Sequence, residues 1–323
     1  MWKWPNATAF IKDLEQPRGG YLPHKMFKRC EKFTQIEPYK PNIDQILWGT
    51  LVDYLMRINL EKDLDQNKLK DILKVSIYGI NNAIKRDKFD DFISEKTFFE
   101  NLFGMFNYKN INCKKNYDII SLLCRYDQNY RQNQTDYIYE LLKHEQKIWE
   151  NLKSQYGLDQ NEQKARSKLR NFLFDDVCKV KDTDLVLSYT DYKNLYAMVQ
   201  NTLAMFDHLL KTSISKQQYS GLTFDGAPCC YIYGADLDYI IGDHLVEMKT
   251  TKQEKVNKNW SYQLLIYYLL GRRCSNQAIF EKIRYFTIIN PKMNILMSLD
   301  ITTLDEEFFK KHDAQIGFQE IYK

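Results

Sequence analysis

The spacing of apolar residues along the chain changes near residue 217. Before that point, apolar positions recur at intervals of three to four residues, which is the period of an amphipathic helix. Four long segments have this period, at 43–60, 67–84, 137–157 and 190–211. Polar stretches near 61–66, 107–116 and 158–164 are expected to be loops. Residues 1–216 are therefore predicted to form a large helical region.

Short runs of β-branched and aromatic residues follow, and they predict strands. These runs lie at 229–233, 235–241, 244–251, 283–289 and 295–301. Gly242-Asp243 separates two of the runs by two residues, which is a signal for a β-hairpin. Asn290-Pro291 marks a turn between two others, and one helix is expected at 259–273. Residues 217–323 are thus predicted to form a small α+β domain.

The predicted hairpin brings four charged residues to one face of the sheet. With Gly242-Asp243 as its turn, Asp238 lies opposite Glu247. In the same register, Asp236 lies opposite Lys249. Side chains alternate along a strand and opposed pairs share a face, so all four project from the same side. A shift of the register by one residue would break this arrangement.

Two carboxylates that face each other across a sheet destabilise it unless a cation lies between them. Mg²⁺ suits such a place, because proteins usually hold it with one or two carboxylates, waters and a phosphate. Lys249, on the same face, could orient a water molecule or neutralise charge that develops on a phosphate. The hairpin therefore predicts a site for Mg²⁺ or Mn²⁺ that acts on phosphate groups.

Together with the helix that follows, these residues resemble a known enzyme family. Asp238 precedes Glu247-Met248-Lys249 by a short hairpin, and Gln263 and Tyr267 come next, four positions apart on one helical face. This order resembles the PD-(D/E)xK nuclease superfamily, in its RecB-like and lambda-exonuclease-like branch. The resemblance implies a restriction-endonuclease-like core, in which helices flank a mixed sheet, and metal-dependent hydrolysis of phosphodiester bonds.

The resemblance also implies a role for each matching residue. Asp238 and Glu247 would bind the metal, and Asp236 would assist them. Lys249 would position the attacking water. Gln263 and Tyr267 would orient the substrate or the catalytic lysine.

A second motif lies in the predicted helix at 43–60, which is expected to pack on the active site. Gly49-Thr50-Leu51-Val52-Asp53 resembles the G-T-x-x-H helix of many RecB-like nucleases. Asp53 stands where that family usually has His, so its assignment as a metal ligand is weaker than that of Asp238.

Basic residues follow the predicted site. In a chain with a net charge of +4, such a group fits a polyanionic partner or an ordinary solvated face. Beside a phosphodiester-cleaving site we expect it to hold the nucleic-acid backbone. The residues are Lys252, Lys255, Lys258, Arg272 and Arg273.

Other patterns narrow the compartment and the chemistry. The seven cysteines form an odd set without a C-x-x-C pair, which favours a reduced cytoplasmic protein without an iron–sulfur cluster. The amino-terminal residues lack a signal-peptide core, and the longest apolar run, at 264–270, is too short to cross a bilayer. No membrane partner is expected. No Gly-rich phosphate loop or G-x-S-x-G motif is present, which argues against an NTPase or a serine hydrolase.

The sequence thus predicts a metal-dependent nuclease, a hydrolase with DNA as its expected substrate, in repair, end processing or defence against foreign DNA. A ribonuclease is one alternative. A catalytically silent nucleic-acid-binding or assembly module with the same fold is another, and it would keep the fold without the chemistry. A protein activator or a homo-oligomeric state stays open.

Overall fold

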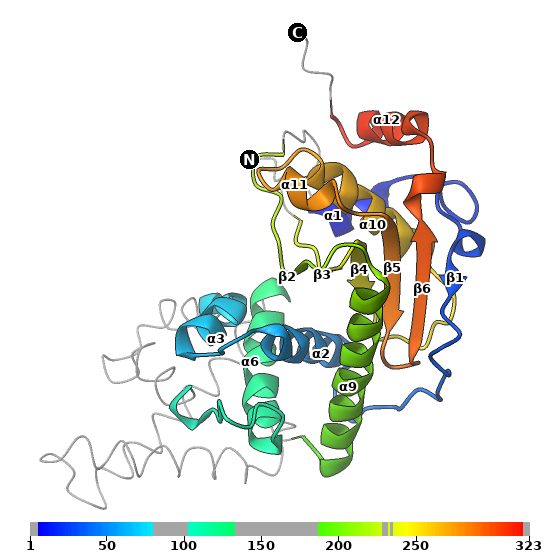
Figure 1. The fold of residues 1–323 in the computed structure, drawn as a ribbon. Coiled ribbons are helices and arrows are strands. Elements are labelled where there is room, and N and C mark those ends of the chain that lie inside the picture. Colours follow the sequence, from blue (N-terminus) through cyan, green and yellow to red (C-terminus); the bar gives the residue numbers. More distant parts are fainter. Residues whose placement is uncertain (1–5, 80–102, 133–186, 228–231, 233–234, 319–323) are drawn as a thin grey trace, which may run out of the picture. The chain divides into compact units, whose positions relative to one another are not determined.

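The structure is a computed structural model that describes residues 6–79, 103–132, 187–227, 232 and 235–318 (Figure 1). The chain forms two compact units: residues 1–39 together with 198–323, and residues 40–197. The sheet unit therefore includes residues 1–39 and 198–216, which the sequence pattern had assigned to the helical region. The predicted helix at 137–157, the predicted loop at 158–164 and nearly all of the predicted strand at 229–233 lie outside the described residues.

The centre of the first unit is a six-stranded mixed sheet with strand order β1-β6-β5-β4-β3-β2. Strands β4 and β5 are parallel, and the other neighbouring pairs are antiparallel. The strands are β1 (Lys28–Arg29), β2 (Gln218–Ser220), β3 (Tyr239–Ile241), β4 (His244–Met248), β5 (Tyr285–Asn290) and β6 (Ile295–Asp300). The prediction of a mixed sheet flanked by helices is confirmed. The two edge strands β1 and β2 had no sequence prediction.

The β3–β4 hairpin has the predicted turn and register. Ile241 pairs with His244 and Tyr239 pairs with Val246, on either side of Gly242-Asp243. Gly242 has a φ of +64°, and a Cβ atom there would lie 2.1 Å from Ser213 Oγ, so both the backbone and the space require glycine. The ladder between the two strands stops at the Tyr239–Val246 pair.

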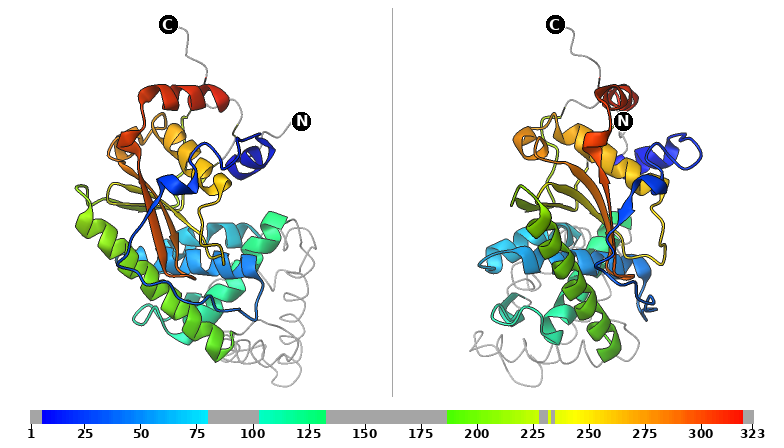
Figure 2. Two further views of the ribbon diagram at one scale, coloured as in Figure 1. Left: turned by 90° about the vertical axis from the view of Figure 1, so that its right-hand side faces the viewer. Right: turned by 45° about the vertical axis from the view of Figure 1, so that its right-hand side comes forward.

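Helices cover both faces of this sheet. Helix α10 (Lys258–Gly271) packs on β4 and β5, and α1 (Ala7–Asp13) packs beside α10 on the same side (Figure 2). On the other face, Phe206 of α9 (Tyr189–Thr212) contacts Tyr239, with ring centroids 5.1 Å apart. The described residues of this unit also include the short helices η1 (His24–Met26), α11 (Gln277–Phe280), η3 (Ile301–Thr303) and α12 (Glu306–Gln315).

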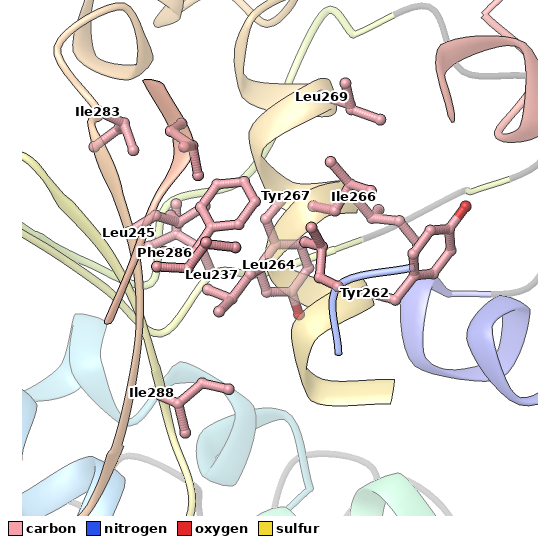
Figure 3. Packing of buried hydrophobic residues seen from close by; sticks show 14 of the residues in the cluster. Leu237, Leu245, Tyr262, Leu264, Ile266, Tyr267, Leu269, Ile283, Phe286 and Ile288 are labelled. Carbon is pink, nitrogen blue, oxygen red and sulfur yellow. The ribbon is translucent and has the colours of Figure 1, made fainter. Parts of the chain in front are cut away.

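The hydrophobic core lies between α10 and the sheet. Leu245 of β4 and Phe286 and Ile288 of β5 point toward Leu264 and Tyr267 of α10 (Figure 3). These residues are less than 5% exposed. Nine of the fourteen residues of α10 are buried, and α1 packs against this helix. The side chains of α10 that reach the end of β4 are therefore held in a fixed place.

The described residues of the second unit are mainly helical and include the predicted helix at 43–60. Among them are α2 (Gln45–Leu60), α3 (Gln66–Ile72), α6 (Lys114–Gln132) and the first part of α9. Asp44 caps α2 by accepting hydrogen bonds from Ile46 N and Leu47 N. The phenol of Tyr54 on α2 donates a short hydrogen bond to the buried carboxylate of Asp127 on α6. None of the helices that the structure describes combines the length and apolar character that a bilayer crossing needs.

His244 lies on the sheet face opposite to Glu247, as strand alternation predicts. Its Nδ1 is 2.7 Å from Thr287 Oγ1, and its ring stacks on Tyr285 with centroids 4.6 Å apart. Burial lowers the pKa of His244 to about 4, against a smaller opposing effect of Asp243. The imidazole is therefore neutral at physiological pH and serves packing.

The low pKa of His244 predicts a loss of stability in mild acid. Between pH 6.5 and about pH 4 the unfolded chain binds a proton that the folded His244 does not, so the free energy of unfolding falls as the pH falls. The expected contribution is about 3 kcal/mol. Urea denaturation of wild type and His244→Asn at stepped pH values measures it. Identical pH dependence in the two proteins would contradict the assignment.

Candidate active site

Four of the predicted catalytic residues form one continuous chain of polar contacts. Lys249 Nζ lies 2.5 Å from Glu247 Oε1 and 3.4 Å from Gln263 Oε1. Gln263 Nε2 in turn donates a hydrogen bond of 2.7 Å to the phenolic oxygen of Tyr267. The chain of contacts therefore leads from the end of β4 to the middle of α10.

The local sequence explains why side chains from the end of β4 and from α10 come into contact. Glu247 and Lys249 are two positions apart in an extended segment, so both side chains point to the α10 side, as Leu245 does. Gln263 and Tyr267 are four positions apart in a helix and lie on one face. The backbone N–H of Lys249 donates to Ile289 O at 2.8 Å, which extends the pairing of β4 with β5 by one residue and fixes the lysine.

Asp238 joins this group through the backbone of the neighbouring strand. Its Oδ2 accepts a hydrogen bond of 2.8 Å from Met248 N. A carboxylate oxygen has two lone-pair positions, so this bond and metal binding are compatible. The charge of Asp238 contributes to raising the pKa of both Lys249 and Tyr267. Asp238 is therefore part of the same electrostatic environment as Glu247.

Asp236 lies beyond the end of the β3–β4 ladder. It forms an isolated antiparallel bridge with Thr223 and is exposed. The β3–β4 ladder does not extend to it, so the expected pairing with Lys249 is absent from the described register. The charge of Asp236 also raises the pKa of Tyr267, but its effect is smaller than those of burial, Glu247 and Asp238.

The protonation states follow from burial and charge. Burial opposes the charged form of Lys249, but the attraction of Glu247 and Asp238 and the hydrogen bond to Glu247 raise its pKa. Lys249 is therefore an ammonium ion at neutral pH. Burial, with the charges of Glu247 and Asp238, raises the pKa of Tyr267, so its phenol keeps its proton. Glu247 is only 1% exposed, and Lys249 supplies its counter-charge.

The carboxylates of Asp238 and Glu247 suit a hard divalent cation. Mg²⁺ and Mn²⁺ take oxygen ligands, and protein sites often supply one or two carboxylates while waters and phosphate oxygens complete the shell. In the described part of the chain, no three or more His, Cys, Asp or Glu side chains form a group that could hold a metal ion. Carboxylate oxygens fit an open magnesium site better than a closed zinc site, which takes mainly Cys and His ligands.

Asp53 belongs to the other compact unit. It lies on α2, where its carboxylate forms an ion pair of 3.0 Å with Arg57 Nε, one helical turn later. Its assignment as a metal ligand stays a prediction.

The predicted basic residues divide into two groups. Lys252, Lys255 and Lys258 are exposed, in the loop after β4 and at the start of α10. Arg272 instead pairs with Glu306 at 2.9 Å and Arg273 with Asp313 at 2.5 Å, which ties the end of α10 to α12. Arg272 is nine residues beyond Gln263, about 14 Å along the helix. The contacts of both arginines favour a structural role, and their role in nucleic-acid binding stays a prediction.

Asn290 is a site residue that the sequence pattern missed. It ends β5, is 2% exposed, and donates from Nδ2 to Thr251 O at 2.8 Å and to Gln253 O at 3.2 Å. These bonds hold the loop that follows Lys249. The pair Asn290-Pro291 had been interpreted only as a turn signal, since nothing local to it indicates contacts some 40 residues earlier.

The Glu247–Lys249 pair predicts strong energetic coupling without any added metal. Lys249→Met leaves Glu247 buried without its counter-charge and is expected to cost about 3 kcal/mol of unfolding free energy. In a double-mutant cycle with Glu247→Gln, the coupling is expected to be about 1–3 kcal/mol. The exposed pair Asp207–Lys211 on α9 is the control, and its coupling is expected to stay below about 0.5 kcal/mol. Equal coupling in the two pairs would contradict this account.

Comparison with protein-family models, with curated proteins and with solved structures found no match. The functional conclusion therefore depends on the residues of this site and their geometry.

Proposed function

We propose that the protein is a metal-dependent nuclease that hydrolyses phosphodiester bonds, with DNA as its expected substrate and a core of the PD-(D/E)xK type. The observation that carries the proposal is the contact chain from Glu247 through Lys249 and Gln263 to Tyr267, with Asp238 beside it. The hairpin motif and the helix motif are separate in sequence. Their side chains nonetheless meet, as that chemistry requires.

Each side chain has a role that its environment supports. Asp238 and Glu247 would hold Mg²⁺ or Mn²⁺, which when bound polarises a phosphate oxygen and activates a water molecule. The Lys249 ammonium has three N–H donors, of which Glu247 and Gln263 take two. The third can hold a water molecule or a phosphate oxygen. Because its pKa is raised, Lys249 acts as a donor and a positive charge at neutral pH, and it does not act as a base.

Gln263 would position Lys249. Its Oε1 faces the ammonium while its Nε2 is bound to Tyr267, so the orientation of the amide is fixed from both ends. Tyr267 is 4% exposed and packs against Phe224, with ring centroids 5.4 Å apart. The tyrosine thus anchors the amide, and the amide limits the freedom of the long lysine side chain.

A second candidate is a catalytically silent nucleic-acid-binding or assembly module. Two observations favour it: no group of three metal-ligating side chains is present among the described residues, and Glu247 has a counter-charge in Lys249 without a metal ion. A ribonuclease would use the same chemistry on RNA, so substrate tests separate it from a deoxyribonuclease.

Cleavage is expected to depend on both members of the ion pair. Purified protein is incubated with single- and double-stranded DNA and RNA in Mg²⁺ or Mn²⁺, beside Glu247→Ala and Lys249→Ala. Each substitution is expected to reduce the cleavage rate at least about 100-fold, because it removes a metal ligand or the positive charge at the phosphate. Lys211→Ala, on an exposed surface of α9, is the matched control and is expected to cleave like wild type. Cleavage that survives both substitutions would refute the assignment, and a folded, nucleic-acid-binding but inactive wild type would favour the silent module.

Metal binding predicts a second, independent result. Mn²⁺ at about a hundredfold excess over its Kd is expected to stabilise the folded protein by about 2.7 kcal/mol, seen as a rise in Tm. Asp238→Ala is expected to lose this rise, whereas Asp207→Ala is expected to keep it. A full rise in Asp238→Ala would place the bound metal elsewhere.

A further inference from the structure

Residues 16–25, here named the amino-terminal arm, lie against the loop between β4 and α10. His24 of the arm accepts a hydrogen bond of 3.0 Å at Nδ1 from Val256 N, near the end of the loop. Gln16 Nε2 donates at 3.0 Å to Asn259 Oδ1, in the first turn of α10. These two bonds hold together parts of the chain that are 232 and 243 residues apart in sequence.

Gly20 allows the arm to approach α10 closely. This residue is buried and has a φ of +80°, and a Cβ atom there would lie 2.6 Å from the Cβ of Lys258, the first residue of α10. A side chain at this position would therefore move the arm away from the helix. Gly19 has a similar φ of +88°, but a Cβ atom there would meet Pro23 at an ordinary distance of 3.8 Å. Of the two glycines, only Gly20 is needed for the contact with α10.

The arm and the loop concentrate positive charge next to the candidate site. Residues 16–25 contain two basic side chains and no acidic one, and residues 250–259 contain three basic side chains and one acidic one, Glu254. Together they carry a net charge of +4, which equals the net charge of the whole chain. All five basic side chains are exposed: Arg18, Lys25, Lys252, Lys255 and Lys258. Charge of one sign on two joined segments favours a polyanionic partner.

We propose that the amino-terminal arm and the loop between β4 and α10 form one surface that binds the phosphate backbone of a nucleic-acid strand beside the candidate site. The proposal rests on the proposed function for the identity of the strand. The loop begins directly after Lys249, and Gln263 lies in the second turn of α10, so the surface adjoins the site. Since His24 and Gln16 already join the arm to the loop and the helix, little conformational entropy is lost when the strand binds. Contacts to the backbone would position the strand without reading its sequence.

The test is the salt dependence of binding to a single-stranded oligodeoxynucleotide. Fluorescence anisotropy gives the affinity of the full chain over a series of NaCl concentrations, with EDTA present so that no metal-dependent cleavage occurs. Loss of one phosphate contact lowers the slope of log K against log salt by about 0.7 for a single strand. The double variant Arg18→Gln, Lys25→Gln is therefore expected to lower the slope by about 1.4 and to weaken binding. Lys282→Gln is the control, because this exposed lysine precedes β5, at the end of that strand away from Asn290.

A second pair of variants changes no charge. Gly20→Asn is expected to separate the arm from α10, and thus to weaken binding and lower the slope. Gly19→Asn is the matched control, because it has the same positive φ without the contact to Lys258, and it is expected to bind like wild type. Asparagine is chosen because it tolerates a positive φ better than most side chains. Thermal unfolding identifies any variant that fails to fold, and the double charge variant then decides the question.

The outcomes separate the surface from the nuclease. Wild-type slopes in the double variant, from a protein that cleaves DNA in Mg²⁺, would overturn the surface and leave the nuclease in place. Wild-type binding by Gly20→Asn would overturn the joining of arm and loop into one surface. Lower slopes from a protein that cleaves neither DNA nor RNA would support the surface and overturn the nuclease. A wild type that neither binds nor cleaves the strand would overturn both.

Discussion

The burial of Glu247 is the constraint to which the rest of this site is fitted. An ionised carboxylate that is 1% exposed costs several kcal/mol unless a positive charge and hydrogen bonds compensate. Lys249 supplies both, and it reaches the same face of the sheet only because it follows Glu247 by two residues. The ammonium group of Lys249 is in turn positioned by Gln263 on α10. The turn at Gly242, the strand register and the burial of α10 thus all help to keep the positive charge of Lys249 beside Glu247.

The end of β4 keeps its charges balanced within the protein. The ammonium of Lys249 is balanced by carboxylates of the protein, so the protein holds it in place whether or not a ligand is present. Such an arrangement is suited to preorganised chemistry, since the charged groups keep their geometry before substrate arrives.

Short-range signals explain which features could be predicted from the sequence. The two-residue turn fixed the hairpin register, and the spacing of Gln263 and Tyr267 placed them on one face of a helix that lies where it was expected. Edge strands β1 and β2 have two and three residues, too few for a period to be recognised. The pairing of Arg273 with Asp313 depends on a helix 40 residues away, and the bonds of Asn290 depend on a preceding loop. Such contacts arise from tertiary packing and leave no local pattern.

The pairing of β1 with β6 has a consequence for the order in which the protein folds. Lys28 pairs with Ser298, so this edge of the sheet joins segments from opposite ends of the chain, and all of residues 40–197 lies between them. During synthesis the amino-terminal segment leaves the ribosome long before its partner strand exists, while the helical unit has all of its residues available to fold. The sheet is therefore completed last, and its closure brings a large loop-closure entropy that local helix formation avoids. The nascent chain would hold the β1 segment unpaired until β6 has been made.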